Sequence, residues 1–479
     1  MFESDASFVL FDYFRVPYDR VEAPDGADTV TVRVAGERPV LMWPTARAIA
    51  ANGGRARPFY LGEMRLFGHI SQDSETHARL YGTRRDWHVT HKLIDRDGRP
   101  VAAVSEANDG STYLPFDPGE LIGNFWTERY LDSVKLPAMG RLAPLARRTY
   151  YRARPLLPRS VQMRLRRSFS RVQSRLRFPG WPVETTLHDF YGFLFELVSR
   201  LADRPVPFVG LWPNDSSWAL VLTHDVEGEK GYSELRKLLE MELEAGYRSS
   251  WNFVPQNRYE VEDDLVHELR EAGFEIGVHG LRHDGRDLAS RAMLLRRLPA
   301  IRSYAERWQS VGFRSPATLR SAELMPMLGF DYDSSYSDTA PFEPQPGGCC
   351  TWLPYMLDEL VELPITLPQD HTLFEILGHH DEKVWLEKAH YLRARGGMAL
   401  LITHPDYFDN PSLLESYRRF LVTFASDSSA WKALPSEVSD WWRRRSESSV
   451  QEVEGEWRVV GPAEGEARVE FASPQLQAV

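Results

Sequence analysis

Carboxylates and histidines that could share a metal ion follow two apolar runs of the sequence. The run SWALVLTHDVEGE brings Asp225 and Glu227, and the run FEIGVHGLRHD brings His279 and His283. Two imidazoles and one carboxylate can bind a divalent cation and leave positions open for water and substrate. The spacing leaves open which carboxylate binds the metal. The histidine pair alone is not specific, because Gly280 stands where the helical metalloprotease motif has Glu.

An arginine and a third histidine end two further runs and complete a set suited to amide hydrolysis. Arg314 follows the run VGF, and His404 follows MALLIT. A bound Zn²⁺ lowers the pKa of its water from about 15.7 toward about 7 and polarises a carbonyl oxygen. A carboxylate can accept the proton of that water, and a histidine can protonate the leaving amine near neutral pH. Arg314 beside Asp225 would favour the ionised carboxylate.

Alternating strands and helices would have to bring these side chains together. Short apolar runs predict strands, and amphipathic patterns between them predict helices. The predicted strands are 218–223, 249–254, 275–279, 360–365 and 398–403, and the helices include 232–245, 261–272 and 381–395. This alternation indicates an α/β fold with a parallel sheet, open or closed into a barrel. The carboxyl ends of parallel strands form one reactive face, so the polar residues should meet there.

The rest of the chain divides by composition. We predict an N-terminal mixed α/β domain over residues 1–135, an Arg-rich helical linker over 136–204 and a catalytic domain over 205–445. Within the first domain, Asp97-Gly98 predicts a hairpin turn between two strands, and residues 115–131 predict a turn followed by a helix. An acidic tail over 446–479 is expected to hold a hairpin between 457–460 and 467–471.

The linker holds an unusual concentration of positive charge. Residues 141–178 contain 12 Arg and no Asp, Glu or Lys, and apolar residues recur from Val161 at helical spacing. One interpretation is a helix packed on an acidic domain surface. The other is a basic amphipathic helix, residues 157–178, that makes peripheral contact with an anionic membrane.

The overall composition bounds the class of protein. The chain has 479 residues, 43% hydrophobic residues and a formal net charge of −11. These values are typical of a folded protein and disfavour a general nucleic-acid binder. The adjacent Cys349 and Cys350 predict reduced thiols rather than a disulfide. Because the N-terminus has no signal-peptide pattern and no run is long enough to span a bilayer, we expect a cytoplasmic location, with membrane association only at the surface.

Four motifs in this order resemble those of the NodB-homology polysaccharide deacetylases, carbohydrate esterase family four. They are THDVE (223–227), HGLRH (279–283), RSPA (314–317) and LITH (401–404), and the resemblance covers roughly residues 215–410. It implies a distorted (β/α) barrel that holds a divalent metal, most simply Zn²⁺, and hydrolyses N-acetyl groups on a sugar or glycan. The resemblance implies metal ligands at His279 and His283, a base at Asp225, and an acid at His404. Arg314 would hold the base.

The sequence departs from that family at three positions. Val226 stands where a second, metal-binding Asp is usual, so the resemblance points to Glu227 as the carboxylate ligand in an Asp-x-Glu motif. Gly280 replaces a Ser or Thr, and Ala317 replaces a Tyr. These departures leave two alternatives to the deacetylase: hydrolysis of a non-sugar C–N bond on the same barrel, and a metal-free glycan-binding module.

Candidate substrate contacts lie outside the four motifs. Asp370 and His371 follow a predicted strand, Tyr336 follows a predicted helix, and Trp251 could stack on a sugar face. Loop capping and core packing are the structural alternatives for these side chains. The expected partner is an acetylated sugar or glycan, with no nucleic acid.

Overall fold

The computed structural model describes residues 8–21, 29–34, 39–71, 87–133 and 177–472, and the isolated positions 164, 166–168, 170 and 173. The chain forms two compact units. The first comprises residues 1–135, 185–210 and 444–479, and the second comprises 136–184 and 211–443. Of the predicted membrane-contacting helix, residues 157–178, only 164, 166–168, 170, 173, 177 and 178 are described, so most of it lies outside the described residues. Among the residues that are described, no helix combines the length and apolar character needed to cross a bilayer.

The first unit is built on an eight-stranded sheet in the order β1-β2-β3-β8-β7-β6-β4-β5. All neighbours are antiparallel except β3 and β8. The strands are β1 (Asp19–Val21), β2 (Thr29–Arg33), β3 (Leu41–Pro44), β4 (Arg57–Leu61), β5 (Met64–Gly68), β6 (His88–Ile94), β7 (Pro100–Glu106) and β8 (Thr112–Tyr113). The helical segments are α1 (Val9–Phe14), α2 (Ala46–Ala51), α4 (Pro118–Trp126), η2 (Arg129–Ser133) and α7 (Thr186–Ala202).

Local sequence signals account for two features of this sheet. The predicted hairpin joins β6 to β7, and Gly98 at its turn has a φ of +77°. The predicted helix is α4, which begins at Asp117, whose carboxylate accepts hydrogen bonds from the backbone of Gly119 and Glu120. A carboxylate at this position satisfies N–H groups that have no partner within the helix.

The predicted linker and tail differ from the structure. The linker was expected to extend to residue 204, but α7 belongs to the first unit, where its buried apolar side packs on β5. In the tail, β19 (Ser449–Val453) pairs with β20 (Glu456–Val460), and β21 (Val469–Ala472) pairs with β9 (Val206–Val209). The predicted pairing of 457–460 with 467–471 is therefore wrong. Glu454 and Gly455 both have positive φ and form a tight turn that pairs the flanking strands instead.

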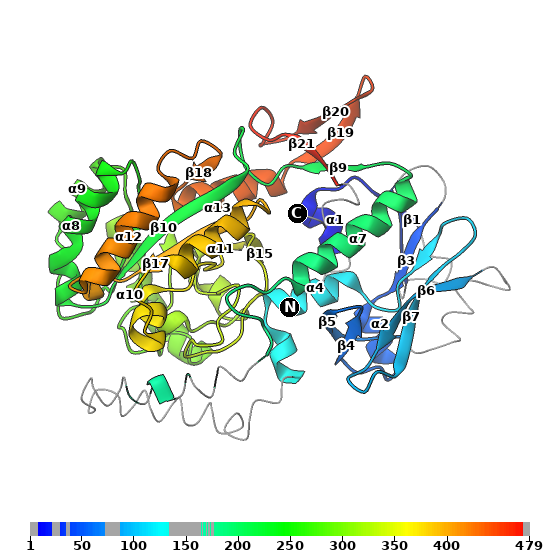
Figure 1. Cartoon of the computed structure of the whole chain (residues 1–479), viewed down its shortest axis with the longest axis horizontal. Helices are drawn as coiled ribbons and strands as arrows, with labels where there is room; N and C mark the ends of the chain where they lie inside the picture. Colours follow the sequence, from blue (N-terminus) through cyan, green and yellow to red (C-terminus); the bar gives the residue numbers. More distant parts are fainter. Residues whose placement is uncertain are drawn as a thin grey trace. The chain divides into compact units, whose positions relative to one another are not determined.

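The second unit is an α/β assembly, as predicted. Its nine-stranded sheet follows the order β15-β16-β14-β13-β12-β11-β10-β17, with β18 also paired to β10, and only β15 is antiparallel to its neighbour. The strands are β10 (Trp218–Val226), β11 (Ser250–Phe253), β12 (Glu275–Val278), β13 (Gly312–Phe313), β14 (Tyr332–Asp333), β15 (Tyr355–Leu357), β16 (Leu360–Glu362), β17 (Met398–Thr403) and β18 (Ala430–Lys432). Figure 1 shows β10 running beside β17.

Helices separate most of these strands along the chain. They are α8 (Glu229–Glu244), α9 (Asp263–Glu271), α10 (Arg291–Trp308), α11 (Lys383–Arg393), α12 (Pro411–Phe424) and α13 (Pro435–Ser446). Shorter helical turns are η5 (Pro316–Thr318), η6 (Met325–Leu328), η7 (His371–Leu377) and η8 (Pro405–Tyr407). Every residue of β10 and β17 is buried, as expected for parallel strands covered on both faces.

After β16, the chain contacts β17, the strand at the opposite end of the strand order. The backbone N–H groups of Thr366 and Leu367 donate to the carbonyl of Leu400 in β17, at 3.3 and 3.0 Å. Ser337, which follows β14, also forms a bridge with Ile365. These bonds connect the β14–β16 side of the sheet to β17.

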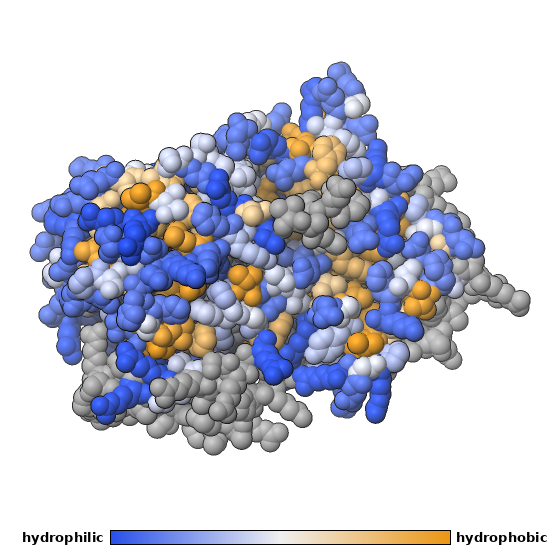
Figure 2. Space-filling model, in the orientation of Figure 1, coloured by the Kyte–Doolittle hydropathy of each residue, from blue (hydrophilic) through white to orange (hydrophobic). Residues whose placement is uncertain are grey.

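The exposed apolar residues are dispersed. Figure 2 shows apolar residues, singly and in small groups, among hydrophilic neighbours on the visible face. The large apolar side chains that are exposed among the described residues are Val89, Leu243, Leu295, Val422, Val453 and Phe471. Isolated exposed apolar residues of this kind are normal for folded proteins. Cys349 and Cys350 are both buried and form no disulfide.

Candidate active site

The end of β10 presents two carboxylates on one side. Side chains alternate along an extended strand, so Asp225 and Glu227 share a direction that Val226 does not. Val226 is fully buried, and the peptide N–H of Glu227 donates to Asp406 Oδ2 at 3.0 Å. The carbonyl of Glu227 accepts a hydrogen bond from Asn257 Nδ2 at 2.7 Å. These contacts fix the chain direction just beyond the strand.

The loop after β12 presents His279 and His283. Gly280 between them has a φ of +65°, and a Cβ there would lie 2.6 Å from both Asp287 Oδ2 and Pro316 Cδ. The loop therefore requires glycine for its backbone and for the space around it. Nδ1 of His279 lies 3.2 Å from the carbonyl oxygen of Arg314. Because a carbonyl only accepts, this contact places the proton on Nδ1 and leaves the Nε2 lone pair for a ligand.

Glu227, His279 and His283 form a cluster whose donor atoms all lie within 4.8 Å of one another. Oε1 of Glu227 is 2.7 Å from His283 Nε2 and 3.9 Å from His279 Nε2. Within the described part of the chain, both Nε2 atoms are buried and make no hydrogen bond. Buried polar atoms rarely lack partners, and one carboxylate with two imidazoles is a donor set that Zn²⁺ accepts. The residues present thus fit a divalent metal.

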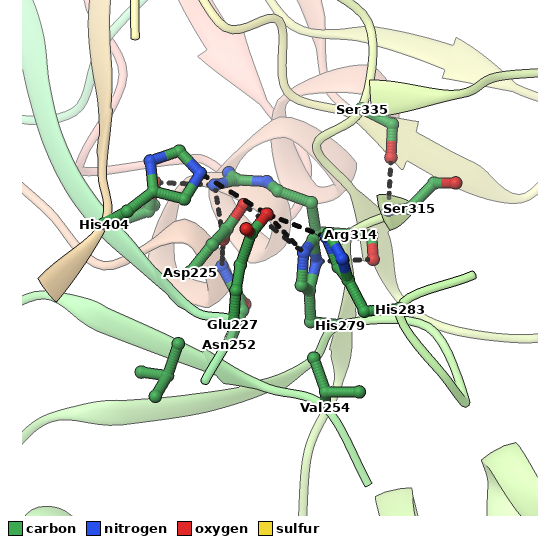
Figure 3. A network of polar contacts seen from close by, with 12 residues as sticks. Asp225, Glu227, Asn252, Val254, His279, His283, Arg314, Ser315, Ser335 and His404 are labelled. Atoms are coloured by element: carbon green, nitrogen blue, oxygen red, sulfur yellow. Dashed lines mark hydrogen bonds and ion pairs between the residues drawn. The ribbon is translucent and has the colours of Figure 1, made fainter. Parts of the chain in front are cut away.

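Asp225 lies beside this cluster, and its two carboxylate oxygens have different neighbours. Its Oδ1 accepts from Arg314 Nη1 at 3.1 Å and from Asn252 Nδ2 at 2.9 Å, whereas Oδ2 lies 3.9 Å from His279 Nε2 (Figure 3). Burial raises the pKa of this carboxyl, but neighbouring groups, the charged Arg314 first among them, lower it, and the net pKa lies below the usual Asp value. The geometry therefore favours an ionised Asp225.

Arg314 is 1% exposed and bonded along its whole guanidinium. Besides Asp225, Nη1 donates to Thr223 Oγ1 at 2.9 Å. Nε and Nη2 donate to the carbonyl and hydroxyl oxygens of Ser334, at 2.7 and 2.9 Å. The side chain is thus held in one orientation, with Nη1 directed at the carboxylate.

His404 approaches from the end of β17 and is oriented by Asp370. Its Nδ1 lies 2.6 Å from Asp370 Oδ1, and its backbone N–H donates to Asp370 Oδ2 at 2.7 Å. Nε2 points toward the cluster of Glu227, His279 and His283, 3.8 Å from Glu227 Oε1 (Figure 3). Burial lowers the pKa of His404, but the carboxylates of Asp370 and Glu227 outweigh it and raise the pKa to about 10.

Of the four predicted substrate contacts, Asp370 and His371 lie at this site. Asp370 is 1% exposed and its carboxylate is occupied by His404, so it acts on the histidine and not as an open ligand. His371 stacks on Tyr407, with ring centroids 5.4 Å apart, and its ring lies 6.5 Å from that of His404. His371 is partly exposed.

Trp251 and Tyr336 do not offer rings to a ligand. Trp251 has no exposed surface and stacks on His224 at 4.1 Å, on the face of β11 opposite to Asn252. Tyr336 is 2% exposed and packs beside Tyr355, with ring centroids 6.3 Å apart. A residue in the middle of a short parallel strand has both faces covered, which is why a single Trp in such a run indicates core packing.

Two polar residues at the site, Asn252 and Asp406, were not among the predicted site residues. Asn252 is a single amide in the apolar run around β11, and its alternation with Trp251 is the only sequence signal for its direction. The carboxylate of Asp406, two residues after His404, accepts from the N–H groups of Glu227 and Gly231, at 3.0 and 3.2 Å, and so binds the start of α8.

Comparisons with known proteins give matches by structure. No protein-family model matches the sequence, and no curated protein matches it. A protein assigned as a polysaccharide deacetylase from Mycobacterium smegmatis matches 48% of this chain and 92% of its own, at 20% identity and a TM-score of 0.40. The Puue allantoinase matches 49% and 93% of the two chains, at 19% identity and a TM-score of 0.40.

A further protein assigned as a polysaccharide deacetylase, from Pseudomonas aeruginosa PAO1, matches 51% of this chain and 96% of its own. Its identity is 19% and its TM-score 0.40. Polysaccharide deacetylases, which the four sequence motifs resemble, are therefore among the solved structures that match this chain.

Proposed function

We propose that this chain is a metal-dependent hydrolase that removes an N-acetyl group from a sugar or glycan. The observation that carries the proposal is the convergence of Glu227, His279 and His283, whose donor atoms lie within 4.8 Å of one another. Asp225 and His404 both lie next to that cluster, with Asp225 Oδ2 3.9 Å from His279 Nε2 and His404 Nε2 3.8 Å from Glu227 Oε1 (Figure 3). Ligands, base and acid are the groups that amide hydrolysis needs in one place.

Glu227, His279 and His283 would hold the metal. When bound, Zn²⁺ would polarise the amide carbonyl and lower the pKa of a water molecule. The hydrogen bond from His279 Nδ1 to the Arg314 carbonyl supports this role, because such contacts orient ligating imidazoles. Glu227 is supported as the third ligand by the position of its Oε1, which lies 2.7 Å from His283 Nε2 and 3.9 Å from His279 Nε2.

Asp225 and His404 would carry the two proton transfers. Asp225, kept ionised by Arg314, accepts the proton of the attacking water through Oδ2. His404, whose pKa is raised to about 10, enters the reaction protonated and donates from Nε2 to the leaving nitrogen. Asp370 and Arg314 act by holding the acid and the base. His371 is the remaining candidate for substrate contact, because it lies next to His404 and is partly exposed.

We interpret the second unit as a distorted (β/α) barrel. The hydrogen bonds from Thr366 and Leu367 to Leu400 support this, since they join both ends of the strand order. In a barrel, the polar residues that follow β10, β12, β13 and β17 would surround one mouth.

The test combines metal analysis with acetate release. His279→Ala and His283→Ala should each lose the bound metal and the release of acetate from N-acetylglucosamine oligosaccharides. His380→Ala, at an exposed histidine, is the matched control and should keep both. A wild-type protein without metal would contradict the proposal and favour a glycan-binding module. Metal with activity only on cyclic amides or ureides would favour the non-sugar hydrolase.

A further inference from the structure

Three residues form one row across neighbouring parallel strands. Asp225 in β10 is directly opposite Asn252 in β11, and Asn252 is directly opposite Gly277 in β12. Register partners in a sheet direct their side chains to the same face. Along this row, the carboxylate of Asp225, the proposed base, is followed by the amide of Asn252 and then by Gly277, which has no side chain.

The amide of Asn252 binds one chosen oxygen of Asp225. Nδ2 donates to Oδ1 at 2.9 Å, and Arg314 Nη1 donates to the same atom at 3.1 Å. Both donors thus occupy Oδ1. Oδ2 lies on the side of the metal cluster, 3.9 Å from His279 Nε2. Asn252 is 2% exposed, so the amide is held at a buried site where an unpaired donor would be costly.

Gly277 provides the space that the amide needs. A Cβ at residue 277 would lie 1.9 Å from Asn252 Oδ1, a separation that no two such atoms can adopt. The backbone of Gly277 is not among the positive-φ positions, so its conformation does not itself require glycine. The missing side chain therefore serves to let Asn252 lie toward Asp225 and not away from it.

We propose that Asn252, seated by Gly277, is a positioning residue that selects Oδ2 of Asp225 as the proton acceptor. This inference rests on the proposed function, because it names the atom through which the base works. Two donors on Oδ1 stop the carboxylate from rotating and leave Oδ2 to take the proton when the water oxygen attacks the carbonyl carbon. Arg314 alone would hold Oδ1 from one direction only.

The kinetic test uses Asn252→Ala and Gly277→Ala in the metal-loaded protein. Each should lower kcat for acetate release by about 10–100-fold while KM and metal stoichiometry stay unchanged. The double variant should be hardly slower than Asn252→Ala, because the added methyl group has no amide left to displace. Ser250→Ala, on the same strand and two residues away, is the control and should keep kcat.

A second measurement detects the contact without any catalysis. Thermal unfolding of the metal-free protein is followed for Asn252→Ala, Asp225→Asn and the double variant. The loss of melting temperature in the double variant should be smaller than the sum of the single losses. Additive losses would overturn the proposal even with normal acetate release.

The outcomes separate this inference from the proposed function. Non-additive unfolding with an inactive wild type would reject the deacetylase and with it the catalytic meaning of Asn252, while keeping the contact. An unchanged kcat in Asn252→Ala, or a raised KM with unchanged kcat, would reject the positioning role.

Discussion

Two pairs of imidazole and carboxylate lie on opposite sides of strand β10 and its end, one fully buried and one partly exposed. On one face, His224 Nε2 lies 2.6 Å from Glu242 Oε1, and on the other, Glu227 Oε1 lies 2.7 Å from His283 Nε2. The two pairs are alike in residue type and in distance. They differ in the hydrogen bonds that surrounding groups make to them.

The His224–Glu242 pair is saturated with hydrogen bonds. Ser249 Oγ donates to the second oxygen of Glu242 at 2.6 Å, Tyr417 donates to the first, and Thr403 Oγ1 lies 2.8 Å from His224 Nδ1. At the Glu227 cluster, by contrast, the Nε2 atoms of His279 and His283 make no hydrogen bond within the described residues. Satisfied buried pairs stabilise a fold, whereas lone pairs left without donors can bind a ligand.

The largest expected effect is on metal affinity, when the glutamate of each pair is replaced by glutamine. Glu227→Gln removes the only anionic donor of the cluster and should lower metal affinity by more than about 100-fold, with acetate release falling accordingly. Competition with a chelator measures the affinity. Glu242→Gln is the matched variant on the other face and should bind metal as the wild type does. Equal metal loss in both variants would contradict the distinction.

For stability, we expect the larger loss at the His224–Glu242 pair. His224→Ala leaves the buried Glu242 without its imidazole partner and should reduce the free energy of unfolding by about 3–5 kcal/mol. Urea denaturation of the metal-free protein measures it. His283→Ala, which removes a ligand from a partly open position, should cost far less in the same assay. A larger loss for His283→Ala would show that both pairs are structural.

The third expected effect concerns the pH dependence of the reaction. Asp370 favours protonated His404, so Asp370→Asn should lower the pKa of His404 from about 10, since burial would then dominate. The proton needed by the leaving nitrogen would be lost at lower pH, and the alkaline limb of kcat should move toward neutrality. Rates measured from pH 6 to 10 test this. An unmoved alkaline limb would mean that another group donates the proton.

The smallest effect is expected at the rim of the site. His371→Ala should raise KM by about 2–10-fold, the value of one or so neutral hydrogen bonds, with little change in kcat. Trp251→Phe, in the core, should change thermal stability and leave KM alone. The reverse pattern would restore Trp251 as a substrate contact.

The strands β10, β11, β12, β16 and β17, and the meeting of Glu227, His279 and His283 near their ends, could be predicted from the sequence for one reason. Parallel strands finish at one edge, so residues that follow β10, β12 and β17 meet there whatever the helices between them contain. The Asp-x-Glu spacing could also be interpreted, because positions 225 and 227 alternate with the buried Val226.

Contacts that depend on register or on loop folding could not be predicted. The bond from Asn252 to Asp225 requires β10 and β11 to align at those residues, and it requires the vacancy at Gly277. The direction of Trp251 depends on the same register. Asp370 reaches His404 across 34 positions of sequence, a contact set by the backbone bonds that join residues 366–367 to β17.

Asp406 ties together the two chain segments that would supply opposite halves of the reaction. It follows His404 by two positions and accepts hydrogen bonds from the backbone of Glu227 and Gly231. A Cβ at Gly231 would lie 2.2 Å from its Oδ2, so the clamp tolerates no side chain there. Anyone transplanting this chemistry to another scaffold would have to move residues 227–231 and 404–406 as one block, because each segment is held by hydrogen bonds to the other.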